Sequence, residues 1–207
     1  MPLPPYRFGP EAPPSHSYLQ APVLKALLAR NIRTVLDIGC GNGALAKAMA
    51  DAGLAVAGID PSESGIANAR KLLPAARFVR AEVGGDPAQI PGGEFDAVVS
   101  TEVIEHLFLP RQLLDLAFAR LRPGGFLLVT TPYHGYLKNL ALALFNRWDS
   151  HWSPQWDGGH VKFWSRRTLA DFLRHAGFEQ VEFQGVGRLP FLWKSMLLIA
   201  RKPDRAA

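Results

Sequence analysis

A strand that breaks into a glycine-rich turn constrains this chain more than any other feature. The strand reads Val35-Leu36-Asp37-Ile38 and the turn reads Gly39-Cys40-Gly41-Asn42-Gly43-Ala44. Apolar side chains on both faces suit a buried parallel strand, and glycines let the backbone turn sharply and approach a ligand closely. A helix that begins after the turn presents unpaired amides to that ligand. This layout predicts a pocket for a nucleotide-like cofactor.

Strand and helix patterns alternate along the rest of the chain. We expect strands at residues 34–38, 54–59, 77–81, 95–100, 126–130, 178–184 and 191–200, and helices at residues 18–30, 44–53, 62–73, 110–121 and 165–176. Ser62 and Ser165 are typical helix N-caps, and Pro123-Gly124-Gly125 is expected to end the helix before it. Repeated strand–helix units predict an α/β fold, a doubly wound and mostly parallel seven-stranded sheet with helices on both faces. Such a sheet binds ligands at the carboxyl ends of its strands.

Length and composition fit one globular domain. The chain has 207 residues, 48% of them hydrophobic, and we interpret residues 1–207 as a single domain with a loose arm at 1–16 and a substrate lid or insertion at 132–164. The single cysteine, Cys40, excludes an internal disulfide and is interpreted as a packing residue. The N-terminus lacks a signal-like pattern and no long apolar run occurs, so we expect a cytoplasmic protein.

Two cofactors fit the glycine turn by pattern alone. Gly39 to Ala44 satisfies the loose dinucleotide pattern, and Asp60 stands about 20 residues further on, where a ribose-binding acid belongs. Asp37, however, places a carboxylate where the pyrophosphate of NAD would lie, and like charges repel. A cofactor with a cationic amino group would instead form a charge-assisted contact there. Asp37 therefore favours such a cofactor over NAD.

Four segments of the chain carry patterns that recur together. They are Val35 to Gly43, Gly58-Ile59-Asp60, Glu94 to Val99 and Leu121-Arg122-Pro123-Gly124-Gly125. In this order they resemble class I S-adenosylmethionine-dependent methyltransferases over roughly residues 20–200. The resemblance implies a Rossmann-like fold with S-adenosyl-L-methionine as the methyl donor. The cofactor-binding residues that it implies are Asp37, Gly39, Cys40, Gly41, Asn42 and Gly43 at the methionine part, Asp60 and Pro61 at the ribose, Glu82 and Val83 at the adenine, and Thr101 and Glu102 nearby. Glu82 is alternatively a solvated carboxylate at a strand end.

Two carboxylates and a histidine follow the fourth expected strand. The spacing of Glu102, Glu105 and His106 predicts that they share one face of a short helix, where they could bind a divalent ion. The segment resembles the E-x-x-E-H of ubiquinone-biosynthesis O-methyltransferases and of methyltransferases that cap small RNAs at the 3′-terminal 2′-hydroxyl. That resemblance implies His160 as a fourth ligand and Mg2+ as the ion, which would hold a hydroxyl acceptor. Alternatively no metal binds, Glu102 lies near the cofactor, and Glu105 and His106 organise the site by hydrogen bonds.

Methyl transfer needs a base only if the acceptor must lose a proton. For a phenol or a ribose hydroxyl, the candidate catalytic bases are His106, His134 and His160. Tyr133 and His134 follow the fifth expected strand, at the mouth where a substrate is expected. We therefore predict a methyltransferase that acts on a small molecule, with a hydroxyl oxygen of an aromatic or lipophilic, quinone-precursor-like compound as the acceptor.

The last third of the chain differs in kind from the cofactor half. Residues 133–207 hold all five tryptophans and the whole excess of basic residues behind the net charge of +5. Within it, residues 136–148 form an apolar pattern that predicts a helix too short to span a bilayer. This helix could lie flat on a membrane over 136–152 and admit a lipophilic acceptor. A buried lid helix over the substrate is the alternative.

Two other functions stay open at this point. An RNA 2′-O-methyltransferase would use the same Glu-Glu-His-His set and the basic last third, but the chain shows no RNA-binding module and no basic run, which disfavours a nucleic-acid partner. A non-enzymatic regulatory protein that binds S-adenosylmethionine is disfavoured by the intact glycine turn and acids. The sequence gives no indication of the oligomeric state.

Overall fold

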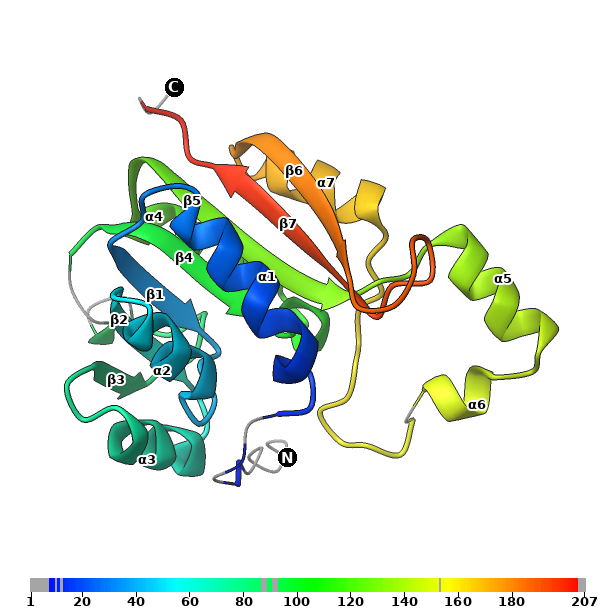
Figure 1. Cartoon of the computed structure of the whole chain (residues 1–207), viewed down its shortest axis with the longest axis horizontal. Helices are drawn as coiled ribbons and strands as arrows, with labels where there is room; N and C mark the ends of the chain where they lie inside the picture. The colour runs from blue at the N-terminus through cyan, green and yellow to red at the C-terminus, as the bar shows by residue number, and fades with distance from the viewer. Residues whose placement is uncertain are drawn as a thin grey trace.

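The strands of the described residues form one seven-stranded sheet (Figure 1). The structure, a computed structural model, describes residues 8–9, 11, 13–86, 89–90, 93–152 and 154–204. The strands are β1 (Thr34–Ile38), β2 (Ala55–Asp60), β3 (Arg77–Arg80), β4 (Phe95–Thr101), β5 (Leu121–Pro132), β6 (Glu179–Val186) and β7 (Ser195–Arg201). Their order is β3-β2-β1-β4-β5-β7-β6. Strand β7 runs antiparallel to β5 and β6, and the other neighbours are parallel. The predicted doubly wound, mostly parallel sheet is confirmed.

Helices cover both faces of this sheet. Within the described residues they are α1 (His16–Leu28), α2 (Ala44–Asp51), α3 (Glu63–Leu72), the 3-10 turn η2 (Ile104–His106), α4 (Arg111–Arg120), α5 (Tyr136–Leu144), α6 (Trp148–His151) and α7 (Arg166–His175). Helices α1, α2 and α3 bury Leu27, Met49 and Ile66 in the core on one face. Helices α4 and α7 bury Leu114 and Leu173 in the core on the other. Helices α5 and α6 stand apart from both layers (Figure 1).

Local sequence signals set several of these boundaries. The Ser62 hydroxyl accepts a hydrogen bond from the Gly65 amide at 3.1 Å, and the Ser165 hydroxyl accepts one from the Thr168 amide at 3.2 Å. Each bond satisfies an amide in the first turn of a helix, which has no carbonyl partner within that helix. Both predicted N-caps are therefore confirmed.

Strands β5 and β7 begin four or more residues away from the positions that the sequence pattern predicts. Strand β5 starts at Leu121 instead of residue 126, because the Pro123-Gly124-Gly125 stretch stays in the strand. Its pairing with β4 shifts register between Phe95 and Ala97, which accommodates the extra residues. Strand β7 starts at Ser195 instead of residue 191.

The expected helix over 136–148 is interrupted at Asn146. This residue has a positive φ of 48°, a conformation that asparagine tolerates better than most residues. The Asn146 amide bonds to the Ala143 carbonyl at 3.3 Å, and the Arg147 amide bonds to the Leu142 carbonyl at 2.8 Å. These bonds close α5 in a Schellman-type turn before α6 begins.

Asp96 ties the start of β1 to β4. Its carboxylate accepts hydrogen bonds from the Arg33 amide at 2.8 Å, the Thr34 amide at 3.0 Å and the Arg122 guanidinium at 2.6 Å. Its own amide donates to the Thr34 hydroxyl at 2.9 Å. Burial works to raise the pKa of Asp96, but these donors outweigh it and hold the pKa below its usual range. The carboxylate therefore stabilises the fold in its ionised form.

We expect Asp96→Ala to lower the free energy of unfolding by about 1–3 kcal/mol, because two backbone amides and a guanidinium lose their acceptor. Chemical denaturation at neutral pH measures this change. Asp115→Ala is the matched control, since Asp115 forms only an exposed pair with Arg111 one helical turn away, and its cost should stay below roughly 0.5 kcal/mol. Equal losses in the two variants would contradict the role given to Asp96.

Candidate functional site

The glycine turn lies where the strand order of the sheet reverses. Strand β1 pairs with β2 on one side and β4 on the other, and ligands of such sheets bind at the carboxyl ends of the strands at this point. Gly39, Gly41 and Gly43 have φ values of 80°, 52° and 80°, a region that disfavours residues with side chains. A Cβ atom on Gly39 would collide with Val103, and one on Gly41 would collide with the Phe8 ring. The turn thus requires glycine for its conformation and for close packing.

Asp37 dominates the electrostatics of this turn. Its side chain is 1% exposed, and neither carboxylate oxygen has a hydrogen-bond partner within the described part of the chain. Burial, together with the charge of Asp60, raises the pKa of Asp37 to about 7. A buried carboxylate without a partner is unfavourable, and a cationic group beside it would offset that cost. Asp37 therefore fits the amino group of S-adenosylmethionine.

Asp60 ends β2 beside the same turn. Its carboxylate accepts hydrogen bonds from the Gly41 amide at 2.9 Å and from the Ser62 amide at 2.8 Å. Burial raises the pKa of Asp60, and the two amides oppose that shift. These bonds hold the carboxylate against the turn, and the ribose-binding role of Asp60 stays a prediction.

The other predicted cofactor residues differ in exposure. Cys40 is buried, and burial, with the charges of Asp37 and Asp60, raises the pKa of its thiol well above the usual value. A Cβ atom on Gly58 would collide with Cys40, which supports its interpretation as a packing residue. Pro61 and Glu82 are exposed, and Val83 and Thr101 are half-buried. Their contacts with the cofactor stay predictions.

Asn42 holds the N-terminal arm across the glycine turn. Its side-chain amide donates to the carbonyls of Gly9 at 3.0 Å and Glu11 at 2.6 Å. The Phe8 amide donates to the Ser64 hydroxyl at 3.0 Å. The described part of the arm is therefore bound to the turn instead of loose, and the Asn42 side chain is engaged by the arm. Residues 1–7, 10 and 12 of the arm lie outside the described residues.

Glu102 does not lie on a helical face with the two ligands predicted beside it, so this part of the prediction is wrong. It follows β4 with a left-handed φ of 54°, and its amide donates to the Thr130 carbonyl at 3.1 Å. Its carboxylate accepts hydrogen bonds from the hydroxyls of Thr130 at 2.9 Å and Ser195 at 3.2 Å. Burial raises the pKa of Glu102 to about 7, against these bonds and the charge of Lys138.

Glu105, His106 and His160 form a cluster of potential ligands. Each offers one ligand atom, and these atoms lie within 4.8 Å of one another. Hydrogen bonds from the amides of Val161 and Lys162 to the Glu105 carbonyl, at 2.9 and 3.0 Å, dock the later segment beside η2. The fold thus brings together three of the four predicted metal ligands and leaves Glu102 outside.

The protonation of this cluster follows from its contacts. His106 Nδ1 lies 2.8 Å from the Gly158 carbonyl, which can only accept, so Nδ1 is the donor of this hydrogen bond. Both Glu105 carboxylate oxygens are buried, with the Thr131 hydroxyl and the Glu105 amide beside them. Burial and the charge of Glu102 raise the pKa of Glu105 well above its usual value. Burial and the neighbouring His106 and His151 lower the pKa of His160 to about 4.

His134 lies in an aromatic enclosure formed with His151, Trp152 and Phe163. Its ring stacks on Trp152 with centroids 5.2 Å apart and meets the edges of Phe163 at 5.5 Å and His151 at 6.0 Å. Burial lowers the pKa of His134 to about 4, helped by the charge of Lys138. The imidazole is therefore neutral at neutral pH and offers one nitrogen as an acceptor.

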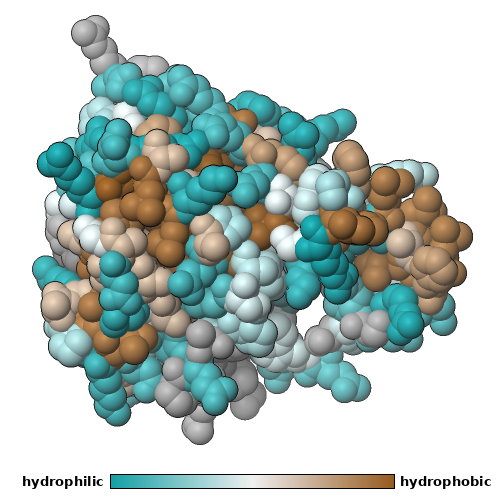
Figure 2. Space-filling model, viewed as in Figure 1, coloured by the Kyte–Doolittle hydropathy of each residue, from teal (hydrophilic) through white to brown (hydrophobic). Residues whose placement is uncertain are grey.

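Helix α5 carries an apolar outer surface. Of its described residues only Lys138 is buried. The large apolar side chains exposed on or beside it are Tyr136, Leu137, Leu140, Leu144 and Phe145. Figure 2 shows hydrophobic surface gathered over this projecting part of the molecule. No helix of the described residues is long and apolar enough to cross a membrane. The membrane contact over 136–152 and the lid over 132–164 stay predictions.

Comparison with known proteins identifies the family. A model described as a methyltransferase domain matches residues 14–182. The chain belongs to the S-adenosylmethionine-dependent methyltransferases. This methyltransferase is 32% identical over 157 residues to a ubiquinone biosynthesis O-methyltransferase of Thiobacillus denitrificans, covering 74% of this chain and 68% of the relative. It is 33% identical over 162 residues to one of Aromatoleum aromaticum, covering 76% and 69%.

The fold of the methyltransferase is also found among solved structures. An O-methyltransferase family protein from Burkholderia thailandensis superposes with a TM-score of 0.69 at 20% identity, covering 91% of this chain and 57% of that one. At this identity the similarity establishes the fold alone. The Rossmann-like class I architecture predicted from the glycine turn and the strand pattern is thereby confirmed.

Sequence reasoning missed several residues of this site. Thr130 and Ser195, which bind Glu102, come from strands that are distant from it in the sequence. A threonine inside an otherwise apolar strand was the available signal for Thr130. Phe8 carries no such signal, because its contact with Gly41 depends on which segment the fold places beside the turn.

We expect Asp37→Asn to weaken binding of S-adenosylhomocysteine by about 10-fold or more, because a neutral amide cannot pair with the amino group. In the wild type, affinity should rise as the pH increases through about 7, where Asp37 ionises. The variant should lose this pH dependence. Calorimetric titration at several pH values measures both effects.

The same substitution should raise the melting temperature of the ligand-free protein by several degrees at about pH 8. The folded pKa of Asp37 lies above that of an unfolded Asp, so the free energy of unfolding is highest below the unfolded pKa and falls as the pH rises toward about 7. Asp51→Asn, in an exposed pair with Lys47, is the control and should change neither quantity. Wild-type affinity in Asp37→Asn would refute the contact.

Proposed function

We propose that this methyltransferase transfers the methyl group of S-adenosylmethionine to a hydroxyl oxygen of a small aromatic or lipophilic acceptor. The observation that carries the proposal is the aromatic enclosure around His134, directly after β5 at the carboxyl edge of the sheet. Flat rings stack well with an aromatic acceptor, and a neutral imidazole among them can accept its hydroxyl hydrogen. The relatives named ubiquinone biosynthesis O-methyltransferase support the same acceptor class.

The residues of the site suit an in-line displacement. S-Adenosylmethionine, when bound, supplies a methyl group on a positively charged sulfur. Asp37, Asp60 and the glycine turn hold and orient that donor, and the aromatic enclosure positions the acceptor oxygen, so that alignment supplies much of the rate. The acceptor must also lose a proton. We assign this step to His134, whose ring stacks on Trp152.

His134→Ala should lower kcat/KM for a long-chain alkylcatechol acceptor by about 100-fold, because both a stacking surface and a base are lost. Transfer of labelled methyl groups measures the rate, and binding of S-adenosylhomocysteine should not change. The control is His175→Ala at the exposed end of α7, which should keep wild-type activity. Methylation of a short RNA, with no activity on any catechol or phenol, would overturn the proposed acceptor class.

We further propose that Glu105, His106 and His160 hold a divalent cation. The buried carboxylate of Glu105 and the Nε2 of His106, whose Nδ1 donates to the Gly158 carbonyl, fit such an ion. With two imidazoles and one carboxylate, the set suits Mn2+ or Zn2+ better than the Mg2+ expected from the sequence. A bound cation would lower the pKa of a coordinated acceptor hydroxyl.

After treatment with a chelator, the protein should bind Mn2+ with an affinity that Glu105→Gln reduces by about 10-fold or more, since a neutral amide is a far weaker ligand than a carboxylate. Calorimetric titration with Mn2+ and with Mg2+ measures the preference. Glu182→Gln, at an exposed pair with Arg30, is the matched control. If the protein takes up neither ion at millimolar concentration, the metal proposal is refuted, and the cluster organises the site by hydrogen bonds instead.

A further inference from the structure

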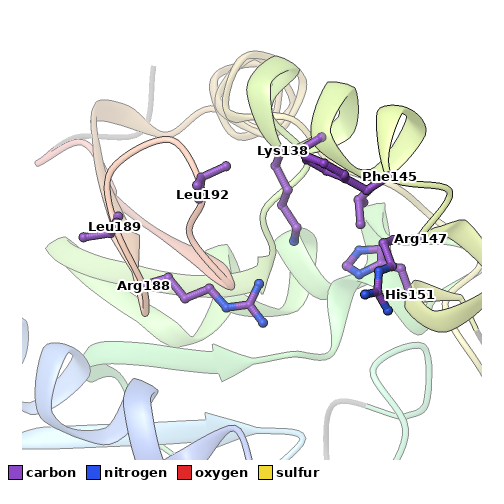
Figure 3. A pocket seen from close by; sticks show the side chains of 9 residues that line it. Lys138, Phe145, Arg147, His151, Arg188, Leu189 and Leu192 are labelled. Carbon is purple, nitrogen blue, oxygen red and sulfur yellow. The ribbon is translucent and has the colours of Figure 1, made fainter.

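A cavity of about 530 Å³ lies between α5, α6 and the loop that joins β6 to β7. The residues that line it are Lys138, Ala141, Leu142, Phe145, Arg147, His151, Arg188, Leu189 and Leu192. Figure 3 shows the side chains of Lys138 and Arg188 entering the same space from opposite walls. A volume of this size is typical of sites that hold small organic ligands.

The polar lining of this cavity is entirely basic. Lys138, Arg147, His151 and Arg188 contribute to it, and no carboxylate is among the lining residues. Lys138 is buried, and its ammonium group donates to the Tyr133 carbonyl at 2.8 Å. Burial and the charge of Arg188 lower the pKa of Lys138 to about 8. The charges of Lys138 and Arg188 thus oppose one another, although the charge of Glu102 acts in the opposite sense on Lys138. An anion between Lys138 and Arg188 would stabilise both of them.

The remaining lining is apolar. Leu142 and Phe145 of the α5 segment line it, together with Leu189 and Leu192 of the β6–β7 loop. Phe145 is 73% exposed and Leu189 is 71% exposed, so their apolar surface is available to a ligand. Hydrocarbon beside clustered positive charge matches a molecule that has both an apolar body and an anionic group.

The cavity adjoins the aromatic enclosure in which we place methyl transfer. His151 belongs to both, because it lines the cavity and meets the rings of His134 at 6.0 Å and Trp152 at 4.9 Å. Lys138 binds the carbonyl of Tyr133, the residue before His134. The cavity and the aromatic enclosure are therefore neighbours that share His151.

We infer that the methyl acceptor is an anionic amphiphile, with its reacting hydroxyl in the aromatic enclosure and a carboxylate or phosphate at its other end among Lys138, Arg147 and Arg188. The assignment of this ligand as the acceptor rests on the proposed function, whereas the anion site itself does not. Arg188 would be a residue that determines specificity, because it approaches the cavity from a different segment than Lys138 and Arg147.

Binding of simple amphiphiles tests the anion site without catalysis. The probes are dodecanoate, dodecanol and dodecyltrimethylammonium, each below its micellar concentration, titrated into the full chain by calorimetry. We expect dodecanoate to bind at least about 10-fold more tightly than the other two, and Arg188→Gln to remove that preference. Arg188→Lys should restore part of it. Arg174→Gln, in an exposed pair with Asp171, is the control and should bind dodecanoate like the wild type.

Kinetics then test whether this anion belongs to the acceptor. The acceptors are ω-(3,4-dihydroxyphenyl)alkanoates and the matching alkylcatechols without the carboxylate. Arg188→Gln should raise KM for the carboxylates by about 10-fold, leave KM for the neutral catechols unchanged and leave kcat unchanged for both. Selective dodecanoate binding with no methylation of any catechol would refute the proposed function but not the anion site.

Three outcomes would overturn the inference. The first is equal affinity for dodecanoate and dodecanol, and the second is wild-type binding of dodecanoate in Arg188→Gln with an unchanged melting temperature. The third is binding to phosphatidylglycerol vesicles that depends on Arg188, with no binding of monomeric dodecanoate. In that case the basic cavity would contact a lipid surface instead of holding an acceptor.

Discussion

The buried carboxylate of Asp37, which has no hydrogen-bond partner within the described residues, is the constraint on which the cofactor site depends. It sits in the central strand β1, which is paired on both sides, so solvent cannot reach it. The glycine turn follows the carboxyl end of β1, and Asp60 places a second carboxylate close to Asp37. Two neighbouring buried carboxylates lower the free energy of unfolding unless a cationic ligand binds beside them. The fold thereby selects a cofactor with a positively charged group over one with a pyrophosphate.

Two hydroxyl groups, one near the carboxyl end of β5 and one at the first residue of β7, fix the position of Glu102. Thr130 and Ser195 bind the Glu102 carboxylate, and the Thr130 carbonyl binds its amide. These contacts hold the Glu102 backbone in a left-handed conformation, and η2 begins only at Ile104. The metal-ligand set that we propose therefore consists of one carboxylate and two imidazoles. Such a set prefers a different metal from the Mg2+ expected from the sequence.

The acceptor side is built from the part of the chain that is richest in tryptophan and basic residues. The segment after β5 contributes the aromatic enclosure and one wall of the basic cavity, and the β6–β7 loop contributes the other wall. Most of α5 faces outward. Under the proposed function, the methyl donor and the acceptor bind to regions of different composition.

The sequence by itself determined the sheet, the helix caps and the cofactor class, because these depend on neighbouring residues: apolar runs, Ser62 and Ser165 as caps, and a carboxylate two residues before a glycine turn. The tertiary structure alone decided where Glu102 points, what covers Asn42, and how Lys138 and Arg188 meet in one cavity. Each of these contacts joins segments far apart in the chain. No local pattern encodes such a contact, since the partner is set by the packing of strands and loops.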